Sequence, residues 1–69
     1  MKSNRIPRNF NRITARQEAE TNAGKPGDIW HITRNNSGYL GLNTNTGEYF
    51  YIFASHLRIK EQWTIQEII

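Results

Sequence analysis

The sequence predicts a mainly β protein: a small antiparallel barrel preceded by a basic N-terminal arm and a short helix. Three observations lead to this prediction. From residue 28 onward, β-branched and aromatic runs alternate with turns rich in Asn and Gly. A chain of 69 residues has room for one domain, which we divide into an arm with its helix (1–25) and a β-domain (26–69). The absence of Cys excludes disulfides and thiolate zinc sites as supplements to a small core.

The arm carries the basic character of the chain. Residues 1–25 contain six Arg or Lys and two Glu, which gives +4, whereas residues 26–69 contain three Arg or Lys and four acidic residues, which gives −1. Residues 1–12 have few large apolar side chains apart from Ile6 and Phe10, so we expect them to be mobile in isolation. Such an asymmetry indicates an acidic partner for the arm.

The short helix is expected at the end of the arm. Thr14 followed by Gln17 matches a capping box, and most of the residues that follow are competent helix formers. Gly24 and the Pro-Gly pair after it would end the helix. These signals predict a helix over Ala15–Asn22.

Three strands are expected next. The run 28–33 has the composition and length of a strand, and the Asn- and Gly-containing turn 34–38 follows it. The run 39–42 alternates, and a second turn at 43–47 leads into the aromatic run 48–53. Short loops between such runs predict an antiparallel meander. The expected core consists of Trp30, Ile32, Leu40, Leu42, Phe50, Ile52 and Leu57.

The remaining residues predict a closing segment with two readings at its end. Ala54–Leu57 is too short for an independent α-helix and indicates a 3₁₀ turn, and Arg58–Lys60 suits a short strand. Residues 63–69 alternate as a strand would, but Thr64 and Glu67 also form a capping box for a last helical turn. We favour the strand.

The stretch 27–60 resembles the small SH3-like barrels of the bacterial SH3 type. The resemblance is carried by Gly27-Asp28 before a strand with Trp30 and Ile32, by Gly38-Tyr39 at the start of the next strand, and by the run Tyr51–Leu57. It implies the fold. It does not imply a groove for proline-rich peptides, because Ala54 and Leu57 stand where peptide-binding SH3 domains have Pro and Tyr.

The sequence gives little support for catalysis. His31 and His56 are the two histidines, and no nucleophile motif accompanies them. The carboxylates are scattered singly, without metal-ligand spacing, and no Gly-rich phosphate loop precedes a helix. We therefore expect a binding module that is not an enzyme and that uses no cofactor or metal.

Basic residues of the arm are the first candidate site. Arg5, Arg8, Arg12 and Arg16 recur at intervals of three, four and four, so a helix formed on a partner would present them as one stripe. With Lys2 they are the expected contacts to nucleic acid, DNA or RNA. An acidic protein surface is the alternative partner, and a solvated tail without function is the third reading.

An aromatic face is the second candidate site. It would comprise Tyr39, Tyr49, Tyr51, Phe53 and His56. Such a face stacks bases or receives a peptide. The competing reading is that the N-terminal helix and Trp63 cover it as part of the core.

These features together predict a nucleic-acid-binding regulator of the kind found in phages and mobile elements. The alternative is a protein-interaction module that inhibits or recruits a protein through the aromatic face. No run is apolar and long enough to span a membrane, and we expect a cytoplasmic protein. Four large apolar residues among the last seven suggest a homodimer: Trp63, Ile65, Ile68 and Ile69.

Overall fold

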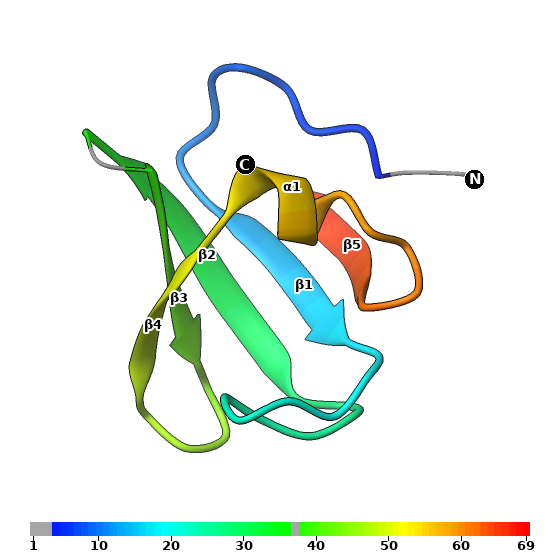
Figure 1. The fold of residues 1–69 in the computed structure, drawn as a ribbon. Helices are drawn as coiled ribbons and strands as arrows, with labels where there is room; N and C mark the ends of the chain where they lie inside the picture. The colour runs from blue at the N-terminus through cyan, green and yellow to red at the C-terminus, as the bar shows by residue number, and fades with distance from the viewer. Residues whose placement is uncertain (1–3, 37) are drawn as a thin grey trace.

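The computed structural model describes residues 4–36 and 38–69 as a single curved antiparallel sheet with one short helix (Figure 1). The elements are β1 (Ile13–Gln17), β2 (Ile29–Asn35), β3 (Gly38–Asn43), β4 (Tyr49–Ile52), α1 (Ala54–Leu57) and β5 (Trp63–Ile68). The strand order across the sheet is β4-β3-β2-β1-β5. The predicted mainly β fold class is confirmed, and this small five-stranded sheet is compatible with an SH3-like fold.

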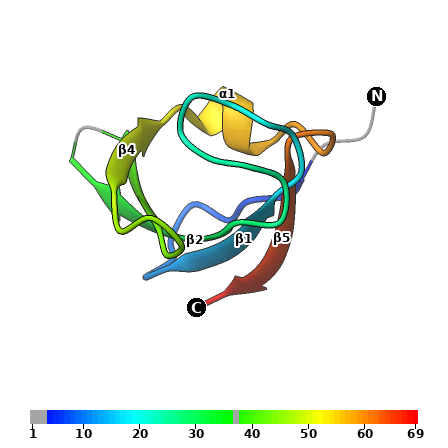
Figure 2. The same ribbon diagram turned by 90° about the horizontal axis from the view of Figure 1, so that it is seen from below.

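The sheet curls without closing into a complete barrel. Its two edge strands, β4 and β5, lie at opposite ends of the arc, with the loop after β1 and helix α1 on the remaining side (Figure 2). Among the described residues, each of these strands pairs with one neighbour, β4 with β3 and β5 with β1. The fold therefore has two sheet edges where a closed barrel would have none.

The prediction of a helix over Ala15–Asn22 is wrong. Residues 13–17 form β1, which pairs with both β2 and β5. Ile13, Ala15 and Gln17 are all buried, which is the two-residue period of a strand. The Gln17 side chain accepts a hydrogen bond from Trp30 Nε1 at 2.9 Å instead of capping a helix. The sheet thus takes one of its inner strands from the segment predicted to belong to the arm.

The core lies on the concave side of the sheet. Its buried apolar members are Ile13, Ala15, Trp30, Ile32, Leu57 and Trp63. The predictions for Trp30, Ile32 and Leu57 are confirmed, and Phe50 and Ile52 pack against this cluster while remaining partly buried.

The prediction that Leu40 and Leu42 belong to the core is wrong. The β2–β3 register sets Gly41 opposite Ile32, so the two leucines lie on the convex face, where they are half-buried. A Cβ at position 41 would meet Trp30 Cε3 at 2.9 Å. The glycine therefore faces inward because the indole ring of Trp30 occupies the space beneath it.

The segment 4–12 is packed rather than free. The backbone N–H of Asn4 donates to the carbonyl of Arg58 at 2.9 Å, and its side-chain amide donates to the carbonyls of Leu57 and Trp63 at 3.1 and 3.0 Å. Ile6 and Phe10 pack against the core. The segment consequently crosses one end of the curled sheet on its way to β1 (Figure 1).

The last strand, β5, covers Trp63–Ile68, which confirms the prediction of a strand over that of a helical turn. Trp63 is 8% exposed and Ile65 packs against the core, whereas Ile68 and Ile69 are 39% and 49% exposed. Residues 58–62 form the turn between α1 and β5 and not the strand expected over Arg58–Lys60. Most of the apolar surface that suggested a dimer at this terminus is thus covered within one chain.

The buried side-chain amide of Asn43 ties the loop after β1 to the turn between β3 and β4. Asn43 is fully buried, and its Nδ2 donates to the carbonyl of Ala23 at 3.1 Å and to Asp28 Oδ2 at 3.0 Å. The hydrogen bond from Asn43 lowers the pKa of Asp28, and the N–H of Lys25 contributes to the same shift. Two loops far apart in sequence are therefore held as one unit at this end of the sheet.

Candidate functional site

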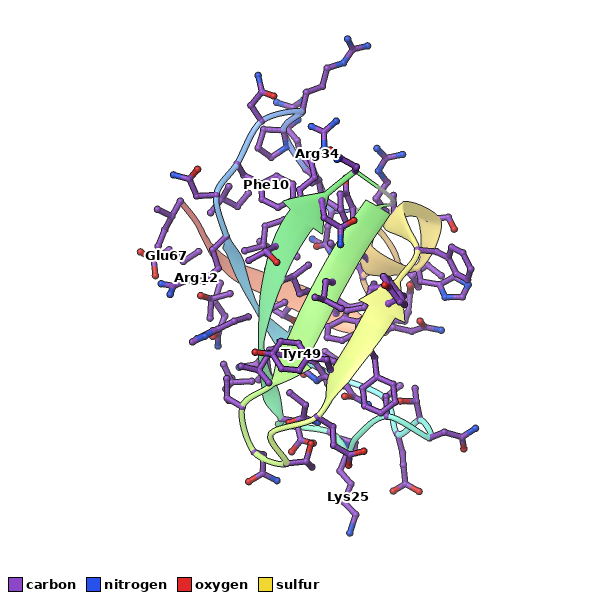
Figure 3. All side chains as sticks on the ribbon, turned by 90° about the vertical axis from the view of Figure 1, so that its left-hand side faces the viewer. Phe10, Arg12, Lys25, Arg34, Tyr49 and Glu67 are labelled. Atoms are coloured by element: carbon purple, nitrogen blue, oxygen red, sulfur yellow. The ribbon has the colours of Figure 1, made fainter. Side chains whose placement is uncertain are left out.

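The charges are separated along the strand direction. The end of the sheet where β2 finishes carries Arg8, Arg12 and Arg34 against Glu67, a balance of +2 among these residues. We call it the basic end. The opposite end carries Arg16 and Lys25 against Glu18, Glu20, Asp28 and Glu48, a balance of −2, and we call it the acidic end. Figure 3 shows Arg34 and Lys25 at opposite ends of the strands.

Without a partner, the four arginines of the predicted stripe do not lie together in the structure. Arg5 and Arg8 are exposed in the segment 4–12, and Arg12 is half-buried just before β1. Arg16 lies within β1, near the acidic end. Residues 13–17 have the two-residue period of a strand and not the helical period that a stripe requires. Lys2 lies outside the described residues.

Arg16 is engaged within the fold. Its Nε and Nη2 lie 3.0 Å from the two carboxylate oxygens of Glu18, and the Thr64 hydroxyl donates to the same carboxylate at 2.6 Å. These hydrogen bonds, that of Arg16 above all, lower the pKa of Glu18 to about 2. The same pairing raises the pKa of Arg16. The charge of this arginine is thus used to join β1 to β5.

Arg34 is the basic residue that sequence reasoning missed. Its Nη1 donates to the backbone carbonyl of Arg8, which joins the end of β2 to the segment 4–12. The available signal was its position directly after the predicted strand 28–33, as the first residue of the predicted turn, but the excess of basic charge was assigned only to residues 1–25. Asn9 and Asn11 line a hollow of about 410 Å³ together with Phe10, Arg34 and Ile69.

Arg12 adds an unused donor near this hollow. Its backbone N–H donates to the carbonyl of Ile69, which lines the hollow. Its side-chain Nε is buried and has no acceptor among residues 4–36 and 38–69. A buried guanidinium nitrogen without a partner is costly, and a bound anion would satisfy it.

The predicted aromatic face divides into three places. Tyr49 and Tyr51 lie on the convex face, 64% and 75% exposed, opposite Leu42 and Leu40 in the ladder. Tyr39 lies on the concave side, because β3 has the opposite phase to that expected. Phe53 is 71% exposed, and its ring meets that of His56 edge-on at a centroid distance of 5.5 Å.

Neither expected cover lies over these exposed rings. The N-terminal helix does not exist, and Trp63 packs edge-on against Trp30 in the core at 5.5 Å. A groove of about 380 Å³ instead brings three of the five predicted aromatic residues together. Its lining residues are Gly38, Tyr39, Tyr51, Ile52, Phe53 and Ala54.

The groove and the hollow of the basic end share a wall. Phe10 lines the hollow, Tyr39 lines the groove, and their rings meet edge-on at 5.5 Å. Tyr39 is also the ladder partner of Arg34. Cationic and amide donors are therefore placed directly beside an apolar surface made of aromatic rings. Such a surface suits a ligand that alternates negative charge with flat rings.

No helix in the described part of the chain is long and apolar enough to cross a membrane.

Comparisons with protein-family models, with curated proteins and with solved structures each find no match.

Proposed function

We propose that the chain is a non-catalytic module that binds single-stranded nucleic acid across its basic end. The observation that carries the proposal is the wall formed by Phe10 and Tyr39, with arginine and asparagine donors on one side and the aromatic groove on the other. We expect a regulator that acts by occupying its target.

The basic end supplies the contacts that nucleic acid requires for affinity. Arg8 and Arg34 of this end, and Arg5 earlier in the segment 4–12, are exposed and form no ion pair with another described residue, so their charges face solvent. Arginine binds phosphate oxygens in a forked geometry, and each neutralised phosphate releases counterions. The side chains of Asn9 and Asn11 can donate to phosphate or to base edges.

The aromatic groove supplies contacts to bases and favours a single strand. Bases stack on aromatic side chains only when they are splayed out of a helix. Tyr51 and Phe53 are highly exposed at the groove, so their rings are accessible to an incoming base. A duplex keeps its bases stacked inside and could use only the arginines.

Titration of labelled short oligonucleotides tests the proposal. We expect single-stranded DNA or RNA to bind more tightly than a duplex of the same length at low salt. Phe53→Ala should weaken single-strand binding by about 1–3 kcal/mol, the usual value of one stacked base. Tyr49→Ala removes an exposed ring outside the groove and should change little. Equal affinity for duplex and single strand, or equal losses in both variants, would contradict the groove as the site of base contact.

A protein partner is the second candidate, and the convex face is the observation in its favour. Tyr49 and Tyr51 stand exposed over the half-buried Leu42 and Leu40, next to a free sheet edge. Exposed tyrosines beside an unpaired strand suit a peptide that adds to the sheet. This function predicts binding that depends weakly on salt and is lost in Tyr49→Ala.

A further inference from the structure

The two edge strands are protected unequally against pairing with another chain. β5 carries Glu67, and its ladder with β1 shifts register between Thr14 and Ala15. Charges and irregular ladders both discourage edge pairing. β4 reads Tyr-Phe-Tyr-Ile, with no charge, no proline and a regular ladder to β3. β4 is therefore the edge that is open to a further strand.

The register identifies the backbone groups that face outward. The N–H of Asn43 donates to the carbonyl of Glu48 at 3.0 Å, so these residues form a hydrogen-bonded pair. Hydrogen-bonded and non-hydrogen-bonded pairs alternate along an antiparallel ladder. Tyr49 and Tyr51 consequently belong to non-hydrogen-bonded pairs with β3, and their N–H and C=O groups point away from the sheet.

The charge layout favours a second copy of the same chain as the added strand. The basic end and the acidic end lie at opposite ends of the strands, and β4 itself is uncharged. Antiparallel pairing of two β4 strands sets the basic end of one copy beside the acidic end of the other, whereas parallel pairing sets like charges together. The chain is thus electrostatically complementary to itself in the antiparallel orientation.

We infer that two copies of the chain associate through β4, antiparallel about a two-fold axis, into one continuous sheet. The outward groups of Tyr49 then form a hydrogen-bonded pair with those of Tyr51 of the second copy, and Phe50 lies at the axis. The paired tyrosine rings share the convex face, where cross-strand contact covers part of their exposed surface. This inference goes beyond the proposed function, with which it shares Tyr51, and its test contains no nucleic acid.

Charge exchange at the paired positions tests both the dimer and its register. Tyr49→Lys combined with Tyr51→Lys sets like charges opposite each other across the inferred interface. Tyr49→Lys combined with Tyr51→Glu sets unlike charges opposite each other in the antiparallel register, but like charges in a parallel register. Both side chains are highly exposed, so the fold should tolerate both double variants, which circular dichroism checks.

Sedimentation equilibrium without nucleic acid, from about 1 μM to 1 mM, gives the readout. We expect the wild type and the Lys/Glu variant to approach twice the 8.1 kDa mass of one chain, and the Lys/Lys variant to remain at that mass. A wild type that stays at 8.1 kDa throughout would overturn the inference, as would a Lys/Lys variant that still dimerises. A Lys/Glu variant that stays monomeric beside a dimeric wild type would overturn the antiparallel register.

Discussion

At the scale of single residues, Glu18 shows how a surface charge can be committed to the fold. Its carboxylate accepts hydrogen bonds from Arg16 on β1 and from Thr64 on β5, and its side chain is 31% exposed. The three residues bridge two strands that are neighbours in the sheet but far apart in sequence. Arg16 is consequently unavailable as a free cation, although the spacing of arginines in the sequence suggested otherwise.

This arrangement predicts acid-sensitive stability. The pKa of Glu18 in the folded chain is about 2, below its ordinary value of 4.5, so the stabilisation is fully present above pH 4.5 and is lost as the pH falls through 2. The urea concentration at which half of the wild type is unfolded should therefore decrease as the pH is lowered from 4.5 to 2. Glu18→Gln should show a smaller fall.

A matched control separates this effect from the general loss of charge. Glu20 is exposed in the same loop, and Glu20→Gln should keep the wild-type dependence on pH. Asp28 also has a lowered pKa, but it is present in all three proteins and cancels in the comparison. Identical pH profiles for the wild type and Glu18→Gln would show that the bridge does not contribute to stability.

At the scale of elements, the sequence pattern identified β2, β3, β4 and β5 but not β1, and it did not identify which face of β3 is buried. Alternation was evident over residues 39–42, but alternation alone does not say which of two faces is buried. The face is decided by Gly41, whose missing side chain makes room for the Trp30 ring. That contact joins two strands, so it could not be read from either strand alone.

The burial of Gly41, and not of the two leucines of β3, gives a quantitative prediction. Ile32→Ala should cost about 2–5 kcal/mol, because Ile32 is fully buried and its loss leaves a cavity. Leu42→Ala should cost about 1 kcal/mol or less, because Leu42 is half-buried on the convex face and solvent can fill the space. Chemical denaturation of the two variants measures both costs. Equal losses would place Leu42 in the core and contradict the observed register.

The helix predicted over Ala15–Asn22 failed for a related reason. A capping box and good helix formers are local signals, whereas β1 is stabilised on both sides by pairing with β2 and β5. Tertiary context of this kind overrides weak helix propensity. The buried Gln17 side chain, which receives the indole N–H of Trp30, reinforces the strand.

At the scale of the whole molecule, the sequence predicted an excess of basic charge near the N-terminus but not its arrangement. The fold carries Arg16 toward the acidic end and brings Arg34 from the β-domain to the basic end. The packing of Phe10 on Tyr39, which joins the two parts of the candidate site, depends on the path of the segment 4–12 over the sheet. Composition alone could not predict that path.

The salt dependence of single-strand binding tests the central claim most directly. Each phosphate contact to a single strand contributes about 0.7 to the slope of log affinity against log salt. Arg34→Gln should therefore reduce the slope by about 0.7, and replacing Arg5, Arg8, Arg12 and Arg34 together should reduce it by about 3. Lys25→Gln removes the same charge from the acidic end and should leave the slope unchanged. An equal reduction for Arg34→Gln and Lys25→Gln, or no binding by the wild type at low salt, would contradict the account.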